Sequence, residues 1–287
     1  METKIYQRLH LEEVMKSTEK NVKVDYYKER VVAFVDILGF SDHVEETTKD
    51  FSKASNLHKA LKSILSWQIE NENNETFGLK DIGREITVFS DSIIISYSID
   101  CQGGLFYILM DLIHLQIQLM SYDLLLRGGI TIGKVYHDGK IAYGPAMIEA
   151  YELESKKAVY PRIIITEESL HKGIIKTLPY QNSLEEECQY VSKLVRRDLD
   201  GYYFLDILRQ DSELVDSGGE YYLWLDLVRE LIIEQVNRNK DKPHVLEKYN
   251  WLIRYFNEVV TDKSAFYPVP DESAREFRTS YRKLEIK

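Results

Sequence analysis

The chain has 287 residues, 44% of them hydrophobic, and a formal net charge of −10 at pH 7. This length and apolar content suffice for one large domain, or for a domain with an appendage. The negative charge argues against nucleic acid as the main partner, because non-specific binding to a phosphate backbone depends on a basic surface. Two cysteines in a chain of this size favour a reducing cytoplasm over a disulfide framework.

The first buried segment ends in an acid. Residues 31–35 are apolar and rich in branched and aromatic types, which predicts a strand buried on both faces. Asp36 then stands at the end of this strand, where a carboxylate must be solvated, hydrogen-bonded or bound to a cation. Gly39 permits a sharp turn, and we expect Ser41 or Asp42 to cap the following helix. This combination favours a site for a metal bound to a phosphate.

The next elements are a helix, a hairpin and a second helix. Apolar residues between positions 51 and 71 recur at steps of three and four, which predicts an amphipathic helix. Segments 85–89 and 93–97 flank a short polar turn, and this pattern predicts a hairpin with Asp91 at or near its tip. Residues 104–122 predict a buried helix, and its polar residues indicate a core helix and not a membrane span.

The second half of the chain alternates short strands with helices. The predicted elements are strands over 124–133, 141–143, 162–166 and 202–206, and helices over 145–157, from Glu167, over 220–236 and over 245–260. Residues 176–200 are mixed and charged and predict no element. Glycines in the strand over 124–133 indicate that another element approaches its backbone closely. The order strand, helix, hairpin, helix, strand is typical of a ferredoxin-like fold, an antiparallel sheet with helices on one face.

Three segments resemble, in the same order, motifs of the class III nucleotide cyclases. Residues 34–41 (Phe-Val-Asp-Ile-Leu-Gly-Phe-Ser) are similar to the first metal motif, and residues 90–92 (Ser-Asp-Ser) to the second. Residues 126–133 (Leu-Arg-Gly-Gly-Ile-Thr-Ile-Gly) are similar to the dimerisation strand. The likeness covers roughly residues 30 to 206. The variant first motif, with a helical C-terminal extension that contains Lys-Tyr-Asn-Trp-Leu at 248–252, resembles most the bacterial pyrimidine cyclases of Pycsar antiphage systems.

The resemblance implies a fold and a domain organisation. The fold class would be α+β, a ferredoxin-like antiparallel sheet with helices on one face, which is the class III cyclase homology domain. We expect an N-terminal leader over 1–28 that docks on the domain or its dimer partner. The catalytic domain would span 29–210, and a helical extension over 211–287 would brace the dimer.

The resemblance also implies site residues. Asp36 and Asp91, with the carbonyl of Ile37, would bind two Mg²⁺ or Mn²⁺ ions, and Arg197 would bind substrate phosphate. The backbone N–H groups that would cradle the β- and γ-phosphates belong to Leu38, Gly39, Phe40 and Ser41. The family's two base-reading positions fall on about Thr87 and Ile141. These residues match neither the adenine pair nor the guanine pair, which favours a pyrimidine.

Two positions depart from the family pattern. Ile148 stands where the family's transition-state helix carries Asn, and Glu152 stands where it carries Arg. Because an acid cannot stabilise an anionic phosphorane, this role must fall elsewhere, and Arg127, Arg162 or Arg197 of a partner subunit are the candidates. Read from the sequence without the family, Arg127 supports the fold, and Glu152 and Glu154 are helix-surface charges.

The implied function is that of a homodimeric, cytoplasmic pyrimidine nucleotide cyclase. It would convert UTP, or CTP, to the 3′,5′-cyclic monophosphate and pyrophosphate, and a separate effector would read this product as a second messenger in antiphage defence. Neither nucleic acid nor a membrane is an expected partner. Two alternatives stay open: a purine cyclase with unusual base recognition, and a catalytically silent nucleotide-binding or scaffold domain.

Overall fold

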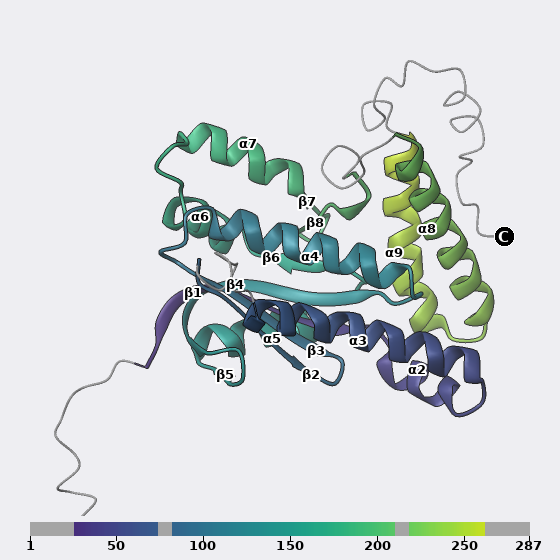
Figure 1. Ribbon diagram of the computed structural model, residues 1–287. Coiled ribbons are helices and arrows are strands. Elements are labelled where there is room, and N and C mark those ends of the chain that lie inside the picture. Colours follow the sequence, from purple (N-terminus) through teal and green to yellow (C-terminus); the bar gives the residue numbers. More distant parts are fainter. Residues whose placement is uncertain (1–25, 74–81, 210–217, 262–287) are drawn as a thin grey trace, which may run out of the picture.

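A central sheet organises the computed structural model, which describes residues 26–73, 82–209 and 218–261 (Figure 1). Its first four strands are β1 (Lys28–Ile37), β2 (Arg84–Phe89), β3 (Ser92–Ser98) and β4 (Leu126–His137). They lie in the order β2-β3-β1-β4, and each neighbouring pair is antiparallel. This is the ferredoxin-like arrangement, so the predicted α+β fold is confirmed.

Three further strands extend the sheet beyond β4. They are β6 (Ile163–Ile165), β8 (Tyr203–Leu205) and β7 (Val195–Arg197), in that order. β6 pairs parallel with β4, so the whole sheet is mixed, and the last two pairs are antiparallel. The short strand β5 (Ala142–Tyr143) pairs with the end of β4.

The segment for which no element was predicted contains both α7 (Leu184–Leu194) and β7. Ser183 and Glu186 form a reciprocal capping box at the start of α7. The Ser-x-x-Glu pattern at these positions is a helix-start signal, and it was visible in the sequence.

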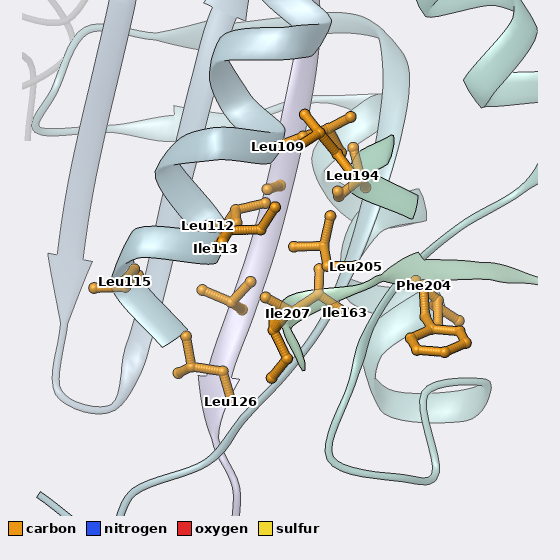
Figure 2. Packing of buried hydrophobic residues seen from close by; sticks show 14 of the residues in the cluster. Leu109, Leu112, Ile113, Leu115, Leu126, Ile163, Leu194, Phe204, Leu205 and Ile207 are labelled. Carbon is orange, nitrogen blue, oxygen red and sulfur yellow. The ribbon is translucent and has the colours of Figure 1, made fainter. Parts of the chain in front are cut away.

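Two helices cover one face of the sheet. They are α3 (Phe51–Asn73) and α4 (Gly104–Met120), which match the predicted helices. Their buried residues pack with Val31, Ala33 and Val35 of β1, and α6 (Glu167–Lys176) also contributes to this core. Figure 2 shows side chains of α4 beside those of β6 and β8. These residues of β1 are apolar because the helices cover this face of the sheet and bury it.

One of the described helices lies on the opposite face, so the prediction that the helices share one face was wrong. α5 (Pro145–Lys156) packs on β4 and β1, and Ala146 forms a small apolar cluster with Val32 and Val135. Since successive strand residues alternate between faces, Phe34 and Asp36 of β1 point to the α5 side. Phe34 confirms this, because its ring meets Tyr151 of α5 edge to face, with ring centroids 5.5 Å apart.

The helix after β1 begins earlier than its predicted caps. α2 (Phe40–Thr47) starts directly after Gly39, which has φ 74° and occupies the N-cap position without a side-chain cap. Ser41 and Asp42 therefore lie inside the first turn, and the prediction that one of them caps the helix was wrong. The left-handed conformation at position 39 is one that glycine adopts without steric cost.

The chain ends, as far as it is described, in a helix hairpin made of α8 (Gly218–Arg238) and α9 (Pro243–Thr261). Figure 1 shows this hairpin at the same end of the sheet as α2. α9 is anchored by Trp251, whose indole N–H donates to Asp198 at 2.6 Å, and by Tyr255, whose hydroxyl donates to Asp206 at 2.5 Å. The 3-10 turn η1 (Ile207–Arg209) connects to the hairpin and packs against α9.

Most of the predicted leader and the end of the predicted extension fall outside the described residues. The boundaries at 28 and 210 stay predictions, although the two C-terminal helices lie where the sequence placed them. No helix within the described segments has the length and apolarity needed to cross a bilayer.

Candidate functional site

Two carboxylates that are far apart in the sequence meet at one end of the sheet. Asp36 is the penultimate residue of β1 and lies opposite Ser92 and Arg127 on the flanking strands. Asp91 lies in the turn between β2 and β3, and its carbonyl accepts a hydrogen bond of 3.2 Å from the N–H of Ile37. The carboxyl groups of Asp36 and Asp91 are within hydrogen-bond reach of each other. The hairpin thus brings Asp91 to the place where β1 ends.

The pairing strongly disfavours two negative charges. Burial, the hydrogen bond and charge of Asp91, and the charge of Glu154 together raise the pKa of Asp36 from 3.8 to about 7, and Arg127 opposes them. The Asp36 side chain is 22% exposed, so the group is half-buried but still reachable from solvent. The site therefore carries more carboxylate than its own cation neutralises.

Arg127 is the cation of this site. Its guanidinium lies 3.8 Å from Asp36 and forms a closer ion pair with Glu154 of α5. Glu154 is only 3% exposed, so the prediction that it is a helix-surface charge was wrong. The reason is the close approach of α5 to β4, because a Cβ atom on Gly129 would lie 2.5 Å from the carbonyl oxygen of Ala150. The close approach predicted for the glycines of this strand is thereby confirmed.

A second acid of α5, Glu152, lies on the helix surface as predicted. Glu152 is exposed and pairs with Lys156 one turn away, at 2.6 Å. Ile148 is also exposed. Neither Ile148 nor Glu152 is positively charged, so neither supplies a cation to the pair formed by Asp36 and Asp91.

The turn after β1 carries the predicted phosphate cradle. The N–H of Leu38 donates to the carbonyl of Leu125 at 2.8 Å, so this group is already committed within the fold. The carbonyl of Gly39 accepts from both Asp42 and His43. Helix geometry leaves the first N–H groups of α2, those of Phe40 and Ser41, without an intrahelical acceptor.

The two predicted base-reading residues lie in different environments. Thr87 is on β2, and its hydroxyl is 3.0 Å from Nε2 of His137, a buried side chain whose Nδ1 is 2.7 Å from the hydroxyl of Ser96. Burial lowers the pKa of His137 to about 3, so this ring is neutral. Ile141 lies in the turn after β4 and is exposed.

Arg197 lies away from the paired acids within one subunit. It is on β7, at the far edge of the sheet, four strands from β1, which corresponds to about 19 Å at the usual strand spacing. Its side chain is exposed, 3.4 Å from Glu167 and over the ring of Tyr203. A phosphate role for Arg197 therefore requires the arginine of a second subunit.

The donor set fits a hard divalent cation. Mg²⁺ and Mn²⁺ prefer carboxylate and carbonyl oxygens, and Mg²⁺ is commonly bound through one or two carboxylates together with substrate phosphates. Asp36 and Asp91 are two such ligands, and their mutual repulsion is relieved by a cation. Among the residues that the structure describes, no cluster of three or more His, Cys, Asp or Glu side chains could hold a metal ion without help.

Comparisons with known proteins found similarity only at the level of solved structures. No family model matches the chain, and no curated protein matches it. The monomeric guanylyl cyclase domain of the RhoGC fusion protein from the aquatic fungus Blastocladiella emersonii is 18% identical, with TM-score 0.40, over 62% of this chain and 95% of that one. A bacterial light-regulated adenylyl cyclase is 15% identical, with TM-score 0.37, over 66% and 68%. The catalytic core of a rhodopsin-guanylyl cyclase with converted specificity, in complex with ATPαS, is 15% identical, with TM-score 0.36, over 62% and 96%.

Proposed function

We propose that this chain is a metal-dependent nucleotide cyclase that acts on a pyrimidine triphosphate. The observation that carries the proposal is the meeting of Asp36 and Asp91 at the end of β1, in a pair that favours binding of a cation. The resemblance of residues 34–41, 90–92 and 126–133 to the class III cyclase motifs supports it. The product would be a 3′,5′-cyclic monophosphate, released together with pyrophosphate.

Each part of the site has a role in this reaction. Asp36 and Asp91, with the carbonyl of Ile37, would hold the metal ions. Bound metal would lower the pKa of the ribose 3′-hydroxyl and neutralise charge on the departing pyrophosphate. The N–H groups at the start of α2, from Phe40 and Ser41, would bind phosphate oxygens, because this end of a helix attracts anions. Arg127 would keep Asp36 oriented through its contact at 3.8 Å.

Substrate choice between UTP and CTP rests on the resemblance to the Pycsar cyclases, as do an antiphage role and an effector that reads the product. The cytoplasm is the proposed location, and both cysteines are free in the structure. A purine cyclase remains the alternative enzyme.

A catalytically silent domain is the second candidate, and one observation favours it. Ile148 and Glu152 occupy the positions where the family's helix stabilises the transition state, and neither is cationic. A silent domain would keep the fold and bind nucleotide without turning it over.

Product analysis separates the candidates. The full chain is incubated with each of the four nucleoside triphosphates and Mn²⁺, and the products are identified by mass. Cyclic UMP or cyclic CMP is the expected product, cyclic AMP or cyclic GMP would establish the purine alternative, and no cyclic product from an intact dimer would leave the silent domain. Asp36→Ala and Asp91→Ala should abolish turnover and keep the fold. The control Asp100→Ala changes an exposed acid two residues after β3 and should retain turnover.

A subunit-mixing experiment tests the shared site. In a head-to-tail homodimer, Asp36 of one subunit and Arg197 of the other would serve the same active site. Mixing inactive Asp36→Ala chains with inactive Arg197→Ala chains should then restore about a quarter of the wild-type activity, because half of the dimers are mixed and each has one intact site. No recovery on mixing would remove Arg197 from the active site.

A further inference from the structure

A pocket of about 200 Å³ opens between the turn after β1 and the C-terminal helix hairpin. One wall is formed by Leu38, Gly39 and Asp42, which follow Asp36 along the chain. The other wall belongs to α8, α9 and the residues between them, among them Arg238, Lys242 and Lys248. The first wall thus begins two residues after Asp36, although neither Asp36 nor Asp91 lines the pocket, and the second wall comes from the C-terminal helix hairpin.

The pocket carries more positive than negative charge. Three cationic side chains and two carboxylates line it. Lys242 lies 3.7 Å from Asp42, and Arg238 lies 3.1 Å from Glu46, so each carboxylate already has a partner. Within residues 26–73, 82–209 and 218–261, no carboxylate forms an ion pair with Lys248. Lys248 is therefore the cation of this pocket that is available to a ligand.

The surroundings of Lys248 disfavour an isolated ammonium group. Burial lowers its pKa, and the positive charge of Arg127 lowers it further, while Asp42 acts in the opposite direction. The same interaction places Lys248 within electrostatic range of the arginine that contacts Asp36. A half-buried cation that forms no ion pair is stabilised when an anion enters.

Packing of its neighbours holds the part of α9 that carries Lys248 in place. Trp251, three residues further on, stacks on Tyr160 with the ring planes 6° apart and donates to Asp198. Tyr249 is buried next to Lys248. The position of the lysine is consequently set by the docking of the hairpin on the sheet and not by a flexible tail.

We propose that Lys248 of α9, flanked by Lys242, binds the terminal phosphates of the substrate in the same subunit that supplies Asp36 and Asp91. The pocket between Gly39 and α9 is the subsite for the pyrophosphate part of the triphosphate. The identity of this ligand rests on the proposed cyclase function, whereas the pocket and its charge do not. The C-terminal hairpin would thus contribute directly to the active site, in addition to any role in bracing a dimer.

Pyrophosphate binding tests the subsite without relying on catalysis. The full chain is titrated with inorganic pyrophosphate in a calorimeter, in metal-free buffer. Lys248→Gln should weaken binding by about 10- to 100-fold, the range expected when a charged hydrogen-bond partner is removed. Lys248→Arg should keep most of the affinity because it keeps the charge, and a thermal melt of each variant checks that it folds.

The matched control is Lys240→Gln, because Lys240 is exposed on the same connection between α8 and α9 but does not line the pocket. It should bind pyrophosphate as the wild type does. Equal affinity of wild type and Lys248→Gln would overturn the proposal. An equal loss in Lys240→Gln would also overturn it, since the binding would then follow overall charge and not the pocket.

Kinetics separate this inference from the proposed function. If the wild type forms a cyclic nucleotide, Lys248→Gln should raise KM for the triphosphate about 10-fold or more, and an unchanged KM would refute the subsite while leaving the cyclase intact. If no triphosphate is cyclised but pyrophosphate binding still depends on Lys248, the phosphate subsite is supported and the cyclase function is refuted.

Discussion

Replacing Asp36 by Asn should stabilise the metal-free protein at high pH. The folded-state pKa of Asp36 is about 7, against 3.8 for the ordinary side chain. Between these values the unfolded chain has released a proton that the folded chain still holds. The contribution of Asp36 to the free energy of unfolding is therefore fully present below about pH 4, and it is lost as the pH rises towards 7. Asn is neutral at every pH and of nearly the same size, so Asp36→Asn removes this loss.

The size of the effect follows from the pKa interval. One pKa unit corresponds to roughly 1.4 kcal/mol, so the interval from 3.8 to about 7 sets a ceiling of about 4 kcal/mol. The side chain is 22% exposed, and water screens part of the repulsion from Asp91. We expect the variant to gain about 2 kcal/mol over the wild type at pH 8, and close to nothing at pH 4.

Urea unfolding at a series of pH values measures this difference. The wild type, Asp36→Asn and the exposed control Asp100→Asn are compared in EDTA, and the control should follow the wild type. Excess Mg²⁺ should then stabilise the wild type at pH 8, by about 2.7 kcal/mol at a hundredfold excess over Kd, and should leave Asp36→Asn nearly unchanged. If wild type and Asp36→Asn keep a constant difference from pH 4 to pH 8, the two carboxylates do not repel each other and the metal proposal loses its physical basis.

Three other changes test how the fold holds the site. Gly129→Val should destabilise the protein by about 1–3 kcal/mol, as overpacking does, because the added atoms collide with α5. Chemical denaturation measures the loss, and an unchanged unfolding midpoint would contradict the close approach of α5 to β4. Tyr255→Phe should cost about 1–3 kcal/mol, because the hydroxyl accepts from the N–H of Leu208 at 2.9 Å in a buried setting, and an unchanged melting temperature would contradict this. Arg127→Gln should destabilise the chain by about 3–5 kcal/mol at pH 8, because Glu154 then stays buried without its partner. Burial already raises the pKa of Glu154, so the loss should shrink as the pH falls and this carboxylate takes up a proton. A loss independent of pH would speak against the ion pair.

Local patterns predicted the half of the site that comes from β1 and the hairpin. The apolar run before Asp36, the glycine after it and the polar turn at Asp91 are short-range signals, and the strands form where these signals lie. Pairing of β1 with β3 then places the two acids together. Asp36 lies opposite Ser92, the first residue of β3, so the turn that carries Asp91 lies at the end of β1. This part of the geometry is set by register, which alternating hydrophobicity strongly specifies.

The other half depends on packing between distant segments, which no local pattern reveals. Glu154 has the sequence surroundings of a surface residue, and only the docking of α5 on Gly129 buries it beside Arg127. Lys248 belongs to a helix more than 200 residues from Asp36 along the chain, and its approach to the site follows from how α9 packs on the sheet. Arg197 was predicted to bind phosphate because it resembles a lysine of the cyclase family. That resemblance could not show that Arg197 lies on β7, at the far edge of the sheet.

These placements suggest where the positive charge for a triphosphate comes from in this chain. In the proposed function a metal binds at Asp36 and Asp91, and the far end of the triphosphate would then have to be neutralised by side chains. Ile148 and Glu152 of α5 supply no positive charge, and Arg127 is already paired with Glu154. Basic side chains around Lys248 of α9 line the same pocket as Leu38 and Gly39, which follow Asp36 along the chain. A chain cut before α8 should therefore lose pyrophosphate affinity together with the stability that α9 lends the sheet, whereas Lys248→Gln in the full chain should lose the affinity alone.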